Sequence, residues 1–215
     1  LKLNFKIAVI SIDDFYLPSN EMKLAIKNNP WNVSRGFPGS HSVKLMHEKL
    51  LNWKMNGELN VPVFDKSLRN GLGDRSHWRS DKPDLLILEG WFLGIKPFSI
   101  DAKYQSTKKV ELSPRESSYR LIINNNLKEY LDVWSLIDNI WHLKPLNFEY
   151  MNLWKSNQEK EMLIHKGNAL RDEKLSNFLR MLNVSIPHKS FDVIKSNALL
   201  LIDQERNLVE AGLNL

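Results

Sequence analysis

Apolar residues along the chain form short aliphatic runs separated by longer amphipathic stretches. The run at 5–12 is short and rich in β-branched side chains, and the run at 84–89 contains four consecutive aliphatic residues, which predicts two buried strands. Residues 140–143 and 198–202 form two further runs, and we interpret 198–202 as the last strand. Between the runs, apolar positions recur at helical spacing, which predicts helices over 19–29, 42–56, 126–138, 147–166 and 172–182.

The connecting segments are polar and contain most of the glycine and proline signals. Residues 31–41 predict a loop, residues 58–83 a long irregular loop, and residues 101–118 an exposed excursion. So long a loop as 58–83 inside a compact domain is usually functional. Because strands alternate with helices, we expect one α/β domain over residues 1–215, with a mostly parallel sheet and helices on both faces.

The amino-acid composition limits the classes of function that this chain can have. The chain has 215 residues, 42% hydrophobic and 26% charged, and it contains no cysteine, which excludes disulfides and thiolate metal sites. No apolar run approaches the ~20 residues of a membrane helix. The net charge of +5 suits an anionic small molecule, while the dispersed lysines and arginines argue against a nucleic-acid surface. We expect a cytoplasmic or plastid-stromal protein with a small-molecule substrate; its oligomeric state stays open.

Two of the aliphatic runs end in carboxylates. Asp13 and Asp14 follow the first run, and Glu89 follows the run at 84–88. Parallel strands bring their carboxyl ends to one edge of a sheet, where such folds bind ligands. Asp13 is therefore a candidate general base, and Asp14 and Glu89 are candidate Mg²⁺ ligands. A turn aspartate or a solvated acid at a strand end is the alternative for each of them.

Cationic side chains lie in the loops and on one helix. Arg35 and His41 belong to a glycine- and proline-rich loop, and Lys155 lies on the long charged helix. A polar loop brings together further candidates for binding an anionic polyhydroxy substrate, namely Asp65, Lys66 and Arg75. A surface loop, a solvated ion pair and a solvated helix face remain alternatives for these residues.

Four segments in this order resemble a known family. They are Ser-Ile-Asp-Asp-Phe-Tyr-Leu from residue 11, Arg-Gly-Phe-Pro-Gly-Ser-His from residue 35, Val-Pro-Val-Phe-Asp-Lys-Ser-Leu-Arg-Asn-Gly-Leu-Gly-Asp-Arg from residue 61, and Leu-Ile-Leu-Glu-Gly-Trp-Phe-Leu-Gly from residue 86. The pattern resembles the D-glycerate 3-kinases of plants, fungi and cyanobacteria. These belong to the P-loop kinase group, together with uridine kinase, phosphoribulokinase and bacterial pantothenate kinase.

The resemblance implies an ATP- and Mg²⁺-dependent transfer of a phosphoryl group to a hydroxyl of D-glycerate. It matches Asp13 to the family's presumed base and Glu89 to its second acidic position near the metal. It matches Lys155 to the family's lid region over the phosphates. It matches the loops that bind the acceptor substrate to Arg35, His41, Asp65, Lys66 and Arg75. A related kinase for another small hydroxylated acceptor, and a non-catalytic nucleotide- or nucleic-acid-binding protein, are the alternatives.

Three departures from the family pattern stand out. No Gly-x-x-x-x-Gly-Lys-Ser/Thr phosphate loop occurs in the 215 residues, Ser42 stands where the family usually has Asp, and Lys155 stands where Arg is more usual. We therefore expect the chain to lack the N-terminal segment with the central strand of the sheet and its phosphate loop. On that expectation, these residues alone bind ATP weakly and are inactive.

Overall fold

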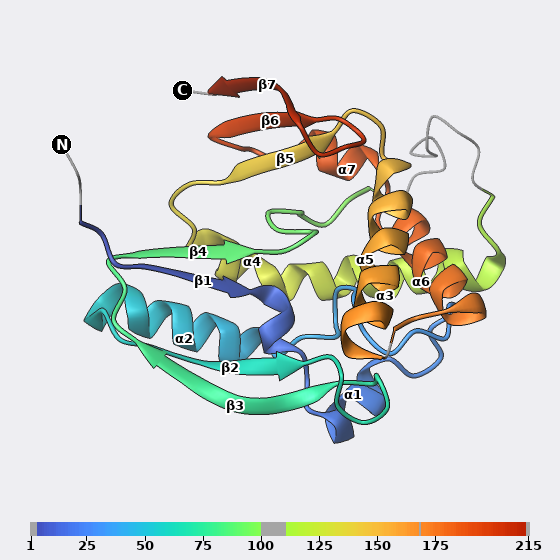
Figure 1. Ribbon diagram of the computed structural model, residues 1–215, viewed down its shortest axis with the longest axis horizontal. Helices are drawn as coiled ribbons and strands as arrows, with labels where there is room; N and C mark the ends of the chain where they lie inside the picture. The colour runs from blue at the N-terminus through green and yellow to red at the C-terminus, as the bar shows by residue number, and fades with distance from the viewer. Residues whose placement is uncertain (1–3, 100–110, 168, 214–215) are drawn as a thin grey trace.

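The computed structural model describes residues 4–99, 111–167 and 169–213. Two pieces of sheet form its centre (Figure 1). Strand β1 (Ile7–Ser11) pairs in parallel with β4 (Leu85–Glu89), and β5 (Trp141–Pro145) pairs in parallel with β6 (Ala198–Ile202). All four strands run in the same direction in Figure 1, so their carboxyl ends share one side of the molecule. The alternation of strands and helices predicted from the sequence is confirmed.

A large cavity separates the two pieces of sheet. It has a volume of about 1320 Å³, and residues from β4 and β5 line it. Within the described residues β4 pairs only with β1, and β5 pairs only with β6, so each presents an unpaired edge to the cavity. The sheet is therefore interrupted at its centre, the position at which the sequence predicts that a strand is lacking.

The region from 58 to 83 is not irregular, and this expectation was wrong. Strands β2 (Leu59–Asp65) and β3 (Asp74–Asp81) form an antiparallel hairpin, and only residues 66–73 make a loop at its tip. The sequence of β3 is Asp-Arg-Ser-His-Trp-Arg-Ser-Asp, and most of it is exposed. Because β3 is held by backbone pairing with β2 rather than by an apolar face, its sequence shows no strand periodicity.

A further strand, near the end of the chain, was also missed. Strand β7 (Leu208–Leu213) pairs antiparallel with β6, so residues 198–202 are not the last strand. All six residues of β7 are exposed, which leaves no alternation of buried and exposed positions in the sequence.

The predicted helices form with shifted ends. They are α1 (Ser19–Ala25), α2 (Val43–Asn56), α4 (Leu131–Ser135), α5 (Tyr150–Lys166) and α6 (Asp172–Val184). The predicted excursion over 101–118 was partly wrong, because α3 (Pro114–Asn126) begins inside it; its residues 101–110 lie outside the described residues. Short 3₁₀ turns at Ile12–Phe15 (η1) and Leu127–Tyr130 (η3) and a short α7 (Lys189–Asp192) complete the helical elements.

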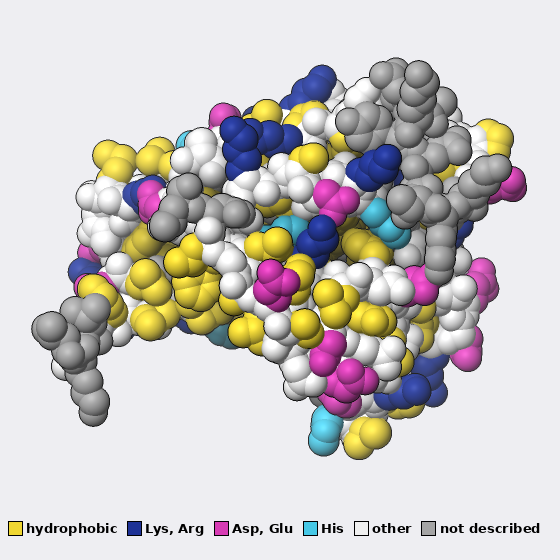
Figure 2. Space-filling model, turned by 90° about the horizontal axis from the view of Figure 1, so that it is seen from above, with side chains coloured by type: hydrophobic (Ala, Val, Ile, Leu, Met, Phe, Trp, Pro, Cys, Tyr) yellow, Lys and Arg dark blue, Asp and Glu magenta, His cyan; other side chains and the backbone are white. Residues whose placement is uncertain are grey.

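The main core lies on one face of the β1–β4 pair. Ala8 and Ile10 of β1 pack there with α2, α3 and the η3 turn. The opposite face is open: Ile7 and Val9 are 55% and 53% exposed, and Leu85 and Ile87 are both 45% exposed. The two strands predicted to be buried are therefore buried on one face, and none of the described helices covers the other face. Figure 2 shows hydrophobic side chains gathered toward the left, the side on which both chain ends lie in Figure 1.

Candidate active site

Asp13 lies directly beyond the carboxyl end of β1. The η1 turn begins after Ser11, whose hydroxyl accepts a hydrogen bond from the Asp13 N–H at 3.2 Å. Asp14 completes this cap by accepting the Ser11 N–H at 3.0 Å. Such reciprocal capping fixes the start of a helical turn. The local sequence therefore turns the chain sharply and leaves the Asp13 side chain at the edge of the sheet.

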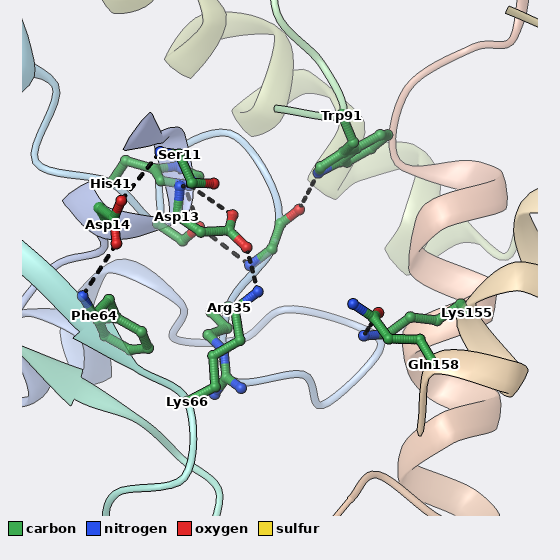
Figure 3. Close-up of polar contacts among 12 residues, drawn as sticks. Ser11, Asp13, Asp14, Arg35, His41, Phe64, Lys66, Trp91, Lys155 and Gln158 are labelled. Atoms are coloured by element: carbon green, nitrogen blue, oxygen red, sulfur yellow. Dashed lines mark hydrogen bonds and ion pairs between the residues drawn. The ribbon is translucent and has the colours of Figure 1, made fainter. Parts of the chain in front are cut away.

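Asp13 is paired with a cation from the hairpin loop. The Lys66 ammonium lies 2.7 Å from Asp13 Oδ2, and His41 Nε2 lies 3.9 Å from Oδ1 (Figure 3). Burial opposes ionisation of this carboxyl, but the nearby His41 ring and the charge of Lys66 outweigh it and hold the pKa of Asp13 well below its usual range. Asp13 is thus an ionised, half-buried acceptor of hydrogen bonds at neutral pH.

His41 forms the inner wall of the site. Its ring stacks on Tyr16 at a centroid distance of 4.5 Å, and its Nδ1 lies 2.8 Å from the hydroxyl of Tyr130. Burial lowers the pKa of His41, while Asp13 partly opposes this shift, so the imidazole is neutral. Sequence analysis did not identify Tyr130, because its place within an apolar helical pattern indicates only a core residue.

Two further cations approach the same space from other elements. Arg35 donates to the carbonyls of Gly71 and Leu72 at 3.0 and 2.7 Å, which ties its loop to the hairpin tip. Lys155 of α5 pairs with Glu159 and lies across from Asp13 and Lys66 in Figure 3. Burial lowers the pKa of Lys155, Glu159 opposes this, and the charges of Lys66 and Arg35 lower it further. Positive charge from three elements therefore converges on this site.

Glycines allow the loop of residues 35–41 to approach the core. At Gly39, where φ is +103°, an added Cβ would lie 2.1 Å from the Asn126 side chain. The neighbouring Gly36 carbonyl accepts a hydrogen bond from the Trp91 indole at 2.8 Å, which connects this loop to the segment after β4. Glycine at position 39 satisfies both the positive φ and the close contact.

Three of the sequence candidates make contacts within the protein scaffold. Asp14 accepts the backbone N–H groups of Ser11 and Phe64, the latter at 3.3 Å. Arg75 donates to the Tyr16 carbonyl at 3.1 Å and to the Ser42 hydroxyl at 2.7 Å. Asp65 accepts both the N–H and the hydroxyl of Ser67. These side chains hold η1, the hairpin and its loop together around Asp13.

Glu89 lies at the same sheet edge as Asp13. Its backbone is in register with Ser11, and its exposed side chain lines the central cavity. The described residues contain no group of three or more histidine, aspartate or glutamate side chains placed to enclose a metal ion. Mg²⁺ in kinase sites is commonly held by one or two carboxylates together with phosphates and water, so an exposed acid at this edge fits that chemistry.

Comparisons with known proteins give a consistent assignment. No protein-family model matches the chain. It is 32% identical over 193 residues to the uncharacterized kinase mug58 of Schizosaccharomyces pombe, covering 82% of this chain and 67% of that protein. It is 31% identical over 187 residues to the chloroplastic D-glycerate 3-kinase of Arabidopsis thaliana, covering 81% of this chain but only 39% of that protein.

Solved structures agree with these relatives. The D-glycerate 3-kinase of Cryptococcus neoformans superposes with a TM-score of 0.81 at 26% identity, over 97% of this chain and 80% of that chain. Phosphoribulokinase from Rhodobacter sphaeroides, at 13% identity and a TM-score of 0.51, covers 93% of this chain and 61% of that chain and supports the fold alone. No described helix has the length and apolarity needed to cross a membrane. The chain therefore belongs to the kinase family that includes mug58 and the D-glycerate 3-kinases.

Proposed function

We propose that this protein transfers the γ-phosphoryl group of ATP to a terminal hydroxyl of D-glycerate, giving 3-phosphoglycerate and ADP. The observation that carries the proposal is the ionised Asp13 beside Lys66 and a buried neutral histidine. A hydroxyl acceptor needs a hydrogen-bond acceptor for its proton, and a carboxylate needs a cation nearby. The names of the two D-glycerate 3-kinases among the similar proteins favour this acceptor over other hydroxylated acids.

In the proposed reaction the acceptor hydroxyl hydrogen-bonds to Asp13. Its oxygen forms a bond to the γ-phosphorus while the bond from that phosphorus to the bridging oxygen of ADP breaks, and the hydroxyl proton passes to the Asp13 carboxylate. A carboxylate with so low a pKa is a weak base. In a loose phosphoryl transition state the nucleophile needs orientation more than early deprotonation, so Asp13 suits an orienting role with late proton transfer.

Lys66 is the proposed partner of the acceptor carboxylate. Its side chain is 41% exposed and comes from the loop at the hairpin tip. A lysine of this kind is a mobile point charge, and it can bind a substrate anion while remaining close to Asp13. Arg75 and Asp65 support this loop through the contacts described above, and Arg35 anchors its other side.

Glu89 and Lys155 are the proposed residues on the side of the site that binds ATP, the phosphoryl donor. An exposed Glu89 at the sheet edge would hold Mg²⁺ directly or through its waters, and Asp14 is less suited because both of its oxygens accept backbone N–H groups. Bound Mg²⁺ would neutralise charge on the ATP phosphates. Lys155 on α5 would stabilise negative charge on the transferred group from the opposite side.

A panel of acceptors tests the proposal in the protein expressed from its complete coding sequence. The panel is D-glycerate, glycerol, which lacks the carboxylate, and lactate, which lacks the terminal hydroxyl. We expect D-glycerate to be phosphorylated with the highest kcat/KM, glycerol poorly and lactate not at all. Preferential phosphorylation of glycerol, or of another hydroxylated acceptor added to the panel, would assign the protein to a different substrate class.

A further inference from the structure

The buried hydroxyl of Tyr130 makes two contacts that together determine the hydrogen positions on His41. The side chain is fully buried. Its oxygen accepts the Gly39 N–H at 3.1 Å and lies 2.8 Å from His41 Nδ1. Gly39 and His41 belong to the same loop, so one residue of η3 connects to this loop at two points.

The direction of the bond to His41 follows from where each hydrogen can go. A backbone N–H can only donate, so the Tyr130 oxygen is the acceptor toward Gly39. If His41 Nδ1 also donated to it, the buried Tyr130 hydroxyl hydrogen would need a third partner, and the described residues provide none in hydrogen-bond contact. If instead Tyr130 donates to Nδ1, the Gly39 and Tyr130 hydrogens are both used. The Ser40 hydroxyl oxygen also lies near Nδ1, but at 3.5 Å it is the longer contact, and its own hydrogen is donated to the Phe37 carbonyl.

The other ring nitrogen supports the same assignment. With Nδ1 acting as acceptor, the neutral ring carries its hydrogen on Nε2. Nε2 lies 3.9 Å from the ionised Asp13 carboxylate, so a hydrogen there is attracted by the negative charge, whereas a lone pair would be repelled. Both arguments place the hydrogen on Nε2.

This Nε2–H is a buried donor that no described group accepts. The His41 side chain is completely inaccessible to solvent, and Nε2 has no hydrogen-bond partner. The 3.9 Å separation from Asp13 is too long for a hydrogen bond. A buried unpaired donor is unfavourable, and the negative charge of Asp13 offsets part of this cost.

We propose that Tyr130 is a positioning residue that holds His41 in the Nε2–H tautomer, so that the hydrogen on Nε2 faces the carboxylate of Asp13. The role of Asp13 as the base rests on the proposed kinase function, while the tautomer does not.

The tautomer is measurable directly by long-range ¹H–¹⁵N correlation spectra of the histidine rings in the 215-residue chain. Substitution His41→Gln identifies the His41 signals by their loss. We expect wild-type His41 to show an acceptor-type Nδ1 and a protonated Nε2. A wild-type spectrum with the hydrogen on Nδ1 overturns the proposal, and this result needs no variant to fold.

Tyr130→Phe removes the donor to Nδ1 while keeping the ring. We expect it to shift the His41 nitrogens toward a mixture of tautomers. Tyr119→Phe is the matched control, because Tyr119 is also a buried tyrosine of the same core but packs edge-to-face against Trp31 and Phe37; it should leave the His41 signals unchanged. Unaltered His41 signals in folded Tyr130→Phe overturn the proposal. Because no turnover is involved, this failure differs from a failure to phosphorylate D-glycerate.

Discussion

Asp13 is the residue on which the proposed chemistry depends, and its charge is set by its neighbours. Lys66 and His41 hold the pKa of its carboxyl well below the ordinary range in spite of burial. A depressed carboxyl pKa stabilises the folded state above the ordinary pKa, and that stabilisation is lost as the pH falls toward the folded-state pKa. Asp13 is therefore ionised throughout the neutral range.

Lys66→Met tests this electrostatic coupling. We expect the pKa of Asp13 to rise, because the variant removes the attraction that opposes the burial penalty. Titration of the Asp13 carboxyl carbon by NMR measures the shift. Lys82→Met is the control, since Lys82 forms an exposed pair with Glu58 away from this site. An Asp13 that titrates at the same pH in wild type and Lys66→Met would show that Lys66 does not control it.

Asp14 should behave differently from its neighbour. It accepts two backbone N–H groups and so joins the end of β1 to the hairpin. We expect Asp14→Ala to lower the free energy of unfolding by about 1–2 kcal/mol, as the loss of a capping acceptor usually does. Urea denaturation measures this. Unchanged stability together with weakened Mg²⁺ binding would instead favour the metal-ligand role predicted from the sequence.

The sequence predicted part of this site at the scale of single residues. Asp13, Glu89 and Lys66 were recognisable because carboxylates that end aliphatic runs meet at one sheet edge, and because the loop sequence resembles a known family. Tyr130 was not recognisable, since a tyrosine within an apolar helical pattern has the same appearance whether its hydroxyl binds a histidine or nothing. The supporting roles of Asp14 and Arg75 depend on contacts between residues far apart in the chain, which no local pattern records.

At the scale of helices and strands, α3 and α6 are joined by an ion pair between the buried Glu116 and Arg180. Glu116 accepts from Arg180 through both of its oxygens, at 2.7 and 2.8 Å, and from the Trp31 indole at 2.9 Å. The hydrogen bond from Arg180 leads the contributions that hold the pKa of Glu116 at about 2. Since the folded-state pKa is depressed, Glu116 stabilises the fold above the ordinary glutamate pKa and loses that effect between about pH 4.5 and 2.

Glu116→Gln should therefore destabilise the protein at pH 7 by roughly 3 kcal/mol, and the difference from wild type should shrink as the pH falls toward 2. Urea midpoints at a series of pH values measure this gap. Glu129→Gln, at an exposed position of the η3 turn, is the control and should have little effect. A gap that stays constant with pH would show that the charge of Glu116 is not the source of its stabilisation.

The sequence predicted helices and strands correctly where the pattern of apolar side chains determines the structure. It failed for strands that are held mainly by hydrogen bonds to a neighbouring strand. The helix at 43–56 ends at Gly57 in the left-handed conformation, as its sequence indicates. The hairpin β2–β3 and strand β7 were missed, because β3 is largely polar and β7 is exposed along its whole length. These strands exist because a neighbouring strand supplies hydrogen bonds, which their own sequences do not reveal.

At the scale of the whole molecule, the interrupted sheet is the dominant feature. The central cavity of about 1320 Å³ separates β4 from β5, and one apolar face of the β1–β4 pair is about half exposed. Such surfaces favour association with other chains or strands. Within the described residues, neither β4 nor β5 pairs with a strand on the side of this cavity.

Hydrogen exchange should report the interruption in the 215-residue chain. We expect the amides of β4 and β5 that face the cavity to exchange rapidly, since they have no strand to pair with there among the described residues. The amides of β6, which is paired on both sides, should be the most protected of the β5–β6–β7 sheet. Equal protection of β4, β5 and β6 would mean that another segment closes the sheet in solution.

The most direct test of the central claim is phosphoryl transfer itself, followed by ³¹P NMR in the protein expressed from its complete coding sequence, with Mg²⁺, ATP and D-glycerate. We predict equal amounts of ADP and 3-phosphoglycerate. Asp13→Asn should lower turnover about 10²–10⁴-fold, as expected for loss of a general base, with the KM for ATP nearly unchanged. Absence of 3-phosphoglycerate from the wild-type reaction, or near-normal turnover by Asp13→Asn, would contradict the account.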